Sequence, residues 1–177
     1  MTIRLPLVAD DEIQPDFFDN ARRWAAALLV VGGAAAIAGS ALDWVVITAR
    51  PELQSGVDFG QGQPGVVAPE ITRPFTGLEA GDGWFVAIAG LVLVVASLLL
   101  LLRKRALYAY LALLASIVIG AIAFADYRGV GDLSSSIAQR MDIVGKARPA
   151  LGLALVAVSA FAGLFGSVAG IAASPRR

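Results

Sequence analysis

The stretch WFVAIAGLVLVVASLLLLL, residues 84–102, decides the fold, because it is long enough to cross a bilayer as an uncharged helix. The cationic turn at 103–105 separates it from a second apolar stretch, ALYAYLALLASIVIGAIAFA, residues 106–125. Residues 24–47 and 149–173 form two further apolar stretches. Membrane-barrel strands would instead alternate in polarity over ~10 residues. The sequence therefore predicts an all-α, polytopic membrane protein, a four-transmembrane-helix bundle.

Composition restricts the chemistry available to this chain. Hydrophobic residues make up 58% of it, the mean hydropathy is +0.75, and 14 basic residues balance 14 acidic ones. This balance gives no indication of a nucleic-acid partner. The sequence contains neither His nor Cys, which removes imidazole and thiolate ligands and the usual nucleophile–base pairs. We expect no enzymatic activity, no cofactor and no metal site.

The distribution of basic residues predicts the orientation. The turn at 103–105 is all cationic, and such short basic loops are retained in the cytoplasm. The tail at 1–23 and the C-terminus at 174–177 should then also lie inside. Twelve Arg against two Lys is typical of a GC-rich bacterial genome, so we expect a multi-pass protein of a bacterial plasma membrane. Residues 38–40 could pass for a signal cleavage site, but the acidic segment before the first span favours an uncleaved anchor.

Two outer loops are expected, at 48–83 and 126–148. The first is dense in Gly and Pro and holds two short β-prone patches, residues 45–48 and 66–68, with Asp82 as N-cap of the next helix. In the second, the serines at 134–136 precede apolar residues at 137, 141 and 144, which predicts a short amphipathic helix ended by Gly145. Pro149 should open the fourth span.

Small residues form stripes along three of the spans. The fourth span has the clearest one, and the first span carries a stripe that also includes Asp43. Such stripes permit close approach of helix backbones. They face each other within one bundle, or one of them binds a partner subunit. The predicted packing or partner-interface residues are Gly152, Ser159, Gly163, Gly166, Gly170, Gly32, Ala36 and Gly39, and a weaker stripe on the third span is Ala109, Ala112, Ser116, Gly120 and Ala123.

Asp43 is the most unusual ionisable residue of the spans. It lies near the C-terminal end of the first predicted helix, where the helix dipole disfavours a negative charge. A cationic partner is therefore expected, with Arg148 or Arg128 as the candidates for a structural ion pair. A functional cation site or proton relay involving Asp43, Asp82 and Asp126 is the alternative.

Several short motifs together resemble a known group of proteins. They are Gly39-Ser40 followed by Trp44, Gly77-Leu78, Gly81-Asp82-Gly83, the basic turn and the glycine-led fourth helix. The chain resembles small, uncharacterised four-helix integral membrane proteins of actinobacteria, of the mycobacterial type. It departs from them at Asp43, where Pro would be expected before the Trp. The resemblance implies the four-span topology.

Two functions from different classes are favoured over a third, a membrane enzyme that would use carboxylates. The first is a non-enzymatic accessory or scaffolding subunit that contacts other integral membrane protein subunits of a larger envelope complex in the lipid bilayer. By analogy of class, lipid importers of the mammalian-cell-entry type are complexes of this kind. The second is a small oligomeric transporter or channel, although the middles of the spans offer only Ser97 and Ser116 as polar residues.

Overall fold

A computed structural model describes residues 14–51, 71–141 and 143–174, with side chains described within 17–48, 72–130 and 147–174. Helices and strands follow one another along the chain as α1 (Gln14–Ala41), β1 (Asp43–Pro51), β2 (Ile71–Thr76), α2 (Gly77–Ala80), α3 (Gly83–Arg103), α4 (Ala106–Met141), β3 (Ile143–Pro149) and α5 (Leu151–Ala172).

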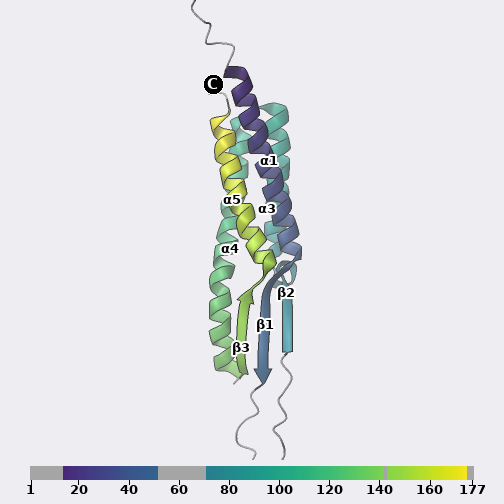
Figure 1. Cartoon of the computed structure of the whole chain (residues 1–177), viewed down its shortest axis with the longest axis vertical. Coiled ribbons are helices and arrows are strands. Elements are labelled where there is room, and N and C mark those ends of the chain that lie inside the picture. Colours follow the sequence, from purple (N-terminus) through teal and green to yellow (C-terminus); the bar gives the residue numbers. More distant parts are fainter. Residues whose placement is uncertain (1–13, 52–70, 142, 175–177) are drawn as a thin grey trace, which may run out of the picture.

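Four of these helices are long and apolar enough to cross a membrane. The qualifying segments are Phe17–Ala41, Gly83–Arg103, Ala106–Val130 and Leu151–Ala172. The chain is therefore a multi-pass membrane protein. Helix α1 packs against α5 and α3, and α4 completes the bundle by packing against the same two helices. The beginning of α1 and the end of α5 lie at the same end of the bundle, which we call the termini end (Figure 1).

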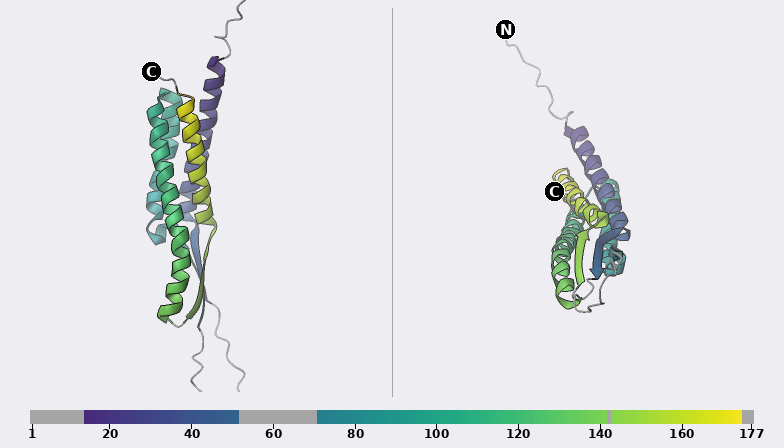
Figure 2. Two further views of the ribbon diagram at one scale, coloured as in Figure 1. Left: turned by 90° about the vertical axis from the view of Figure 1, so that its left-hand side faces the viewer. Right: turned by 60° about the horizontal axis from the view of Figure 1, so that its bottom comes forward.

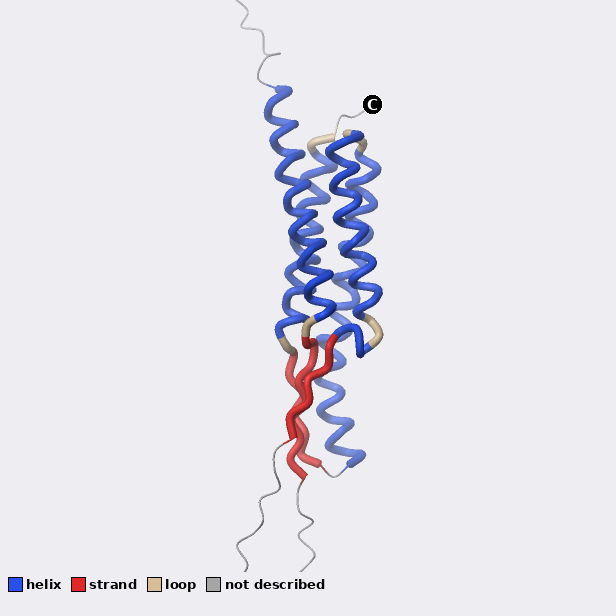
Figure 3. The backbone as a smooth tube through the Cα atoms, turned by 90° about the vertical axis from the view of Figure 1, so that its right-hand side faces the viewer, coloured by secondary structure: helices blue, strands red, loops and turns tan. Residues whose placement is uncertain are grey.

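A three-stranded antiparallel sheet projects from the opposite end, which we call the sheet end (Figure 3). Its strand order is β2-β1-β3, so the central strand β1 pairs on both sides. Val46, for example, lies opposite Pro74 on β2 and Arg148 on β3. The predicted bundle of four membrane-spanning helices is thus consistent with the structure, but the all-α class omits the sheet that joins the helices.

Helix α1 is shorter at its end than the predicted span 24–47, because the chain leaves the helix at Ala41 and enters β1 at Asp43. The residues at 45–48 are Val-Val-Ile-Thr, whose branched Cβ atoms favour strands. The predicted β-prone patch at 45–48 is thus part of a strand, whereas the patch at 66–68 lies outside the described residues.

Helix α4 corrects the second predicted loop. It continues without a break from Ala106 to Met141, about 54 Å at 1.5 Å per residue, so it extends well past a ~30 Å hydrocarbon core. Its last part lies alongside β3 (Figure 2). The separate amphipathic helix, its serine cap and its end at Gly145 are wrong, since residues 137 and 141 belong to α4 while 144 and 145 belong to β3.

Two predicted helix starts also differ in detail. Pro149 ends β3, and α5 begins two residues later at Leu151 with Ala150 as its N-cap. Asp82 does occupy the N-cap position of α3, but its side chain makes no capping hydrogen bond. Its carbonyl oxygen instead accepts from the amides of Phe85 and Val86.

Candidate functional site: the glycine-rich interface and an apolar groove

Helices α1 and α5 approach each other through glycine. A Cβ built on Gly32 would lie 3.1 Å from the carbonyl oxygen of Ser159, and one on Gly39 would lie 3.0 Å from that of Gly152. Contacts this short leave little room for a side chain between the backbones. The sequence prediction that small residues mark a close helix contact therefore has a definite counterpart in α1 and α5.

The whole predicted stripe faces the interior of the chain itself. Gly166 lies against Ala25 and Leu29 of α1, and Gly170 lies against Leu100 of α3 and Ala109 of α4. All eight predicted packing residues are buried, namely Gly32, Ala36, Gly39, Gly152, Ser159, Gly163, Gly166 and Gly170. Of the two alternatives left by the sequence, the geometry corresponds to stripes that face each other within one bundle.

The weaker stripe on the third span takes part in the same packing. A Cβ built on Gly163 would collide with the hydroxyl of Ser116, and a Cβ built on Gly120 would lie 3.5 Å from the Cβ of Ala160. Ala109, Ala112 and Ala123 are buried as well.

A second glycine contact, between α1 and α3, was missed by the sequence reasoning. A Cβ on Gly33 would lie 2.6 Å from the carbonyl oxygen of Gly90, and one on Gly90 would lie 2.8 Å from that of Gly33. About two helical turns away, the hydroxyl of Ser97 donates to the carbonyl of Ala26 at 2.9 Å, which links the same two helices. The doublet Gly32-Gly33 was the available signal, because neighbouring residues on a helix face different partners.

Trp44 connects the helices to the sheet, a role that the sequence analysis did not predict. Its side chain is 1% exposed, and its indole nitrogen donates to the carbonyl of Gly39 at 2.8 Å. Gly77 and Gly152 leave the space that the indole fills. The amide of Ala150 donates to the Trp44 carbonyl at 2.8 Å. One residue thus joins the end of α1 to the start of α5.

Asp43 forms no ion pair with Arg128 or Arg148 in the structure. All three residues belong to the part of the chain whose side chains are described. Because α1 ends at Ala41, Asp43 is an exposed strand residue and not part of a helix face. Arg148 lies opposite Val46, about 10 Å further along β1 at ~3.3 Å per residue. The guanidinium carbon of Arg128 lies 4.7 Å from the centroid of the Phe124 ring.

The ion pairs recorded for the described side chains lie at the termini end instead. Arg22 is 6% exposed, and it donates to Asp19 at 2.9 Å and to the carbonyl of Ala173 at 3.0 Å. Asp19 also pairs with Lys104 at 3.4 Å, in the turn between α3 and α4. This network ties α1 to the end of α5 and to the basic turn.

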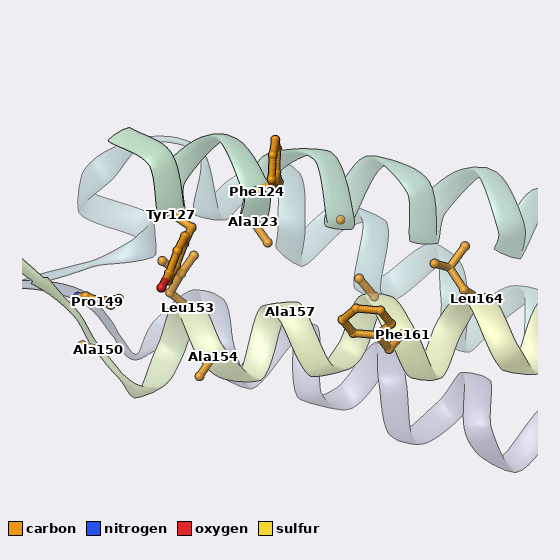
Figure 4. A pocket seen from close by; sticks show the side chains of 12 residues that line it. Ala123, Phe124, Tyr127, Pro149, Ala150, Leu153, Ala154, Ala157, Phe161 and Leu164 are labelled. Carbon is orange, nitrogen blue, oxygen red and sulfur yellow. The ribbon is translucent and has the colours of Figure 1, made fainter. Parts of the chain in front are cut away.

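An apolar groove of about 450 Å³ lies between α4 and α5 in the half of the bundle nearest the sheet (Figure 4). Small residues form much of its lining, and Phe124, Tyr127 and Phe161 contribute aromatic rings. Figure 4 shows the Tyr127 ring pointing from α4 toward Leu153 of α5. Among the described residues, no three carboxylate, His or Cys side chains are grouped so that they could hold a metal ion. The groove is therefore an apolar feature of the surface in this half of the bundle.

Comparison of the chain with known proteins identifies no family for it. The chain matches none of the known protein-family models, and a search of curated proteins finds no match.

Proposed function

We propose that the protein is a non-enzymatic accessory or scaffolding subunit of a larger bacterial envelope membrane complex, of which a lipid transporter is one example. The observation that supports this proposal is the direct junction of helices and sheet. Leu42 alone connects α1 to β1, and Ala150 alone connects β3 to α5. A sheet held this tightly moves with its bundle, and it presents a fixed surface beyond the membrane.

The proposed orientation places the termini end in the cytoplasm. The basic turn supports it, because Arg103, Lys104 and Arg105 are exposed at that end. The sheet and the extension of α4 then face the outside. The partner surface we propose is this projecting part, since the glycine stripe of α5 is used inside the chain.

The alternative, a small oligomeric transporter or channel, has less support from the core. Within the described side chains, the buried serines are Ser40, Ser97, Ser116, Ser159, Ser167 and Ser174. Each of their hydroxyls donates to a backbone carbonyl, so each is already satisfied by the protein. A polar pathway would have to form between copies of the chain.

Co-purification in a mild detergent tests the proposal. We expect the tagged full chain to bring down another membrane protein in stoichiometric amount. That association should weaken in Arg73→Ala or Arg148→Ala, which change exposed residues of β2 and β3. Arg105→Ala removes the same charge at the termini end and is the matched control. A homo-oligomer alone would favour the transporter, and equal retention in all variants would exclude the sheet as the contact surface.

Cysteine labelling tests the orientation separately. Thr72→Cys introduces a thiol on the exposed part of β2, and Arg105→Cys introduces one in the basic turn of this Cys-free chain. On intact cells an impermeant maleimide should label the first variant and not the second. The reverse pattern would overturn the proposed orientation without affecting the fold.

A further inference from the structure

The groove between α4 and α5 opens at the surface of the bundle that faces lipid. Phe124 is 60% exposed, Tyr127 64% and Phe161 63%, so these rings border the groove without closing it. Ala123, Ala157 and Ala160 also line the groove, and their small side chains leave the space open. In a membrane, such a lateral opening is in contact with acyl chains.

The length of the groove matches one leaflet. On α5 its lining runs from Leu153 to Leu164, which is about 16 Å at 1.5 Å per residue. The hydrocarbon core of a bilayer is ~30 Å thick, so the groove extends from the sheet end of the bundle to about the midplane. Tyr127 lies near Leu153 at its outer end, the level at which aromatic side chains mark the membrane interface (Figure 4).

The size and the apolar lining of the groove suit a hydrocarbon chain as its occupant. Its volume of about 450 Å³ lies in the range of ~300–1,000 Å³ that is usual for small-molecule pockets. A flexible hydrocarbon chain can fill an apolar space of this size that opens toward lipid.

A positively charged residue, Arg128, lies at the end of the groove nearest the sheet. Arg128 lies one residue after Tyr127, and its guanidinium packs over Phe124, which is itself part of the groove. The described side chains give this exposed arginine no carboxylate partner. An arginine at the interface attracts anionic lipid headgroups.

We propose that this groove binds one acyl chain of an anionic glycerophospholipid, with Arg128 at its phosphate and headgroup. The acyl chain lies along Ala157 toward the midplane, and the headgroup remains at the level of Tyr127. This inference goes beyond the proposed function and does not rest on it, because a lipid site is compatible with an accessory subunit and with a transporter.

Native mass spectrometry of the purified full chain tests the site. The protein in detergent is offered equal amounts of phosphatidylglycerol and phosphatidylcholine with identical acyl chains. We expect one phosphatidylglycerol to be retained about fivefold more than phosphatidylcholine, the effect of one basic residue near a membrane surface. Arg128→Gln should abolish this preference, whereas Arg73→Gln, an exposed arginine on β2 at the far edge of the sheet, should preserve it.

Filling the groove tests the acyl-chain site. Ala157→Phe should abolish retention of both lipids, while Ala121→Phe, on an exposed position of α4 outside the groove, should retain lipid as the wild type does. Ala154→Leu, at an exposed lining position, repeats the test with a smaller change should Ala157→Phe unfold. Lipid retention that survives both groove variants overturns the proposal. So does a dimer mass that these variants abolish, because the groove would then be an interface between two copies.

Discussion

Gly152→Ala is the sharpest test of the close approach between α1 and α5. The added methyl would lie 2.7 Å from the carbonyl oxygen of Asp43 and 2.8 Å from that of Gly39. The third neighbour is the indole of Trp44, also at 2.8 Å. Two of these atoms are backbone and the third is a fully buried ring, so the helices must separate to admit the methyl. Overpacking of this kind costs about 1–3 kcal/mol.

The control is Gly129→Ala on α4. A Cβ built there meets nothing within 4 Å, so the substitution should only improve helix propensity, by about 0.5–1 kcal/mol. In thermal unfolding in one detergent, followed by circular dichroism, the Tm should then fall for Gly152→Ala and rise for Gly129→Ala. For a chain of this size a loss of 1–3 kcal/mol lowers Tm by roughly 3–10 °C. Equal stabilisation by both substitutions would refute the packing of α5 against α1.

Three further predictions use the same unfolding assay. Replacing both Gly166 and Gly170 by Leu should destabilise the monomer itself, because both positions face α1, α3 or α4, and an unchanged Tm would place them against lipid. Trp44→Ala should cost about 3–5 kcal/mol through the cavity it leaves, and more than Trp84→Ala, which removes a 61% exposed indole; equal losses would argue against the Trp44 junction. Arg22→Leu should cost about 1.5–3 kcal/mol through its buried charged hydrogen bonds, whereas Lys104→Gln, which breaks an exposed pair, should cost under ~1 kcal/mol, and the reverse order would contradict the network.

The helices were predictable because their signal is local. The run at 84–102 has no charge over a membrane thickness, and α3 was found at Gly83–Arg103. The sheet depends on long-range pairing instead. Val46 pairs with Arg148, about a hundred residues later, and no local pattern announces that partner. The same pairing explains why the chain around Gly145 is a strand and not the end of a short helix.

The site was predictable only where one helix carries the whole pattern. The stripe from Gly152 to Gly170 follows helical periodicity, so its close contacts could be expected, although not which helix would meet it. The Asp43 pair failed because it required a helix that continues to residue 47. The groove was missed because its walls combine side chains of α4 and α5, and the sequence does not specify how two helices are aligned.

The burial of the glycine stripe changes which surfaces can serve a partner. A close glycine contact uses one face of each helix. On α5 this face already packs against Gly32 and Gly39 of α1, so it is not open to a partner helix. The helix faces that remain carry large apolar side chains such as Leu102, Leu114 and Phe165, which suit lipid. In the function we propose, polar recognition of the partner is left to the parts beyond the hydrocarbon core, where a single residue connects the sheet to α1 on one side and to α5 on the other. The proposed accessory role therefore depends on a tightly packed bundle that holds the sheet in a fixed position.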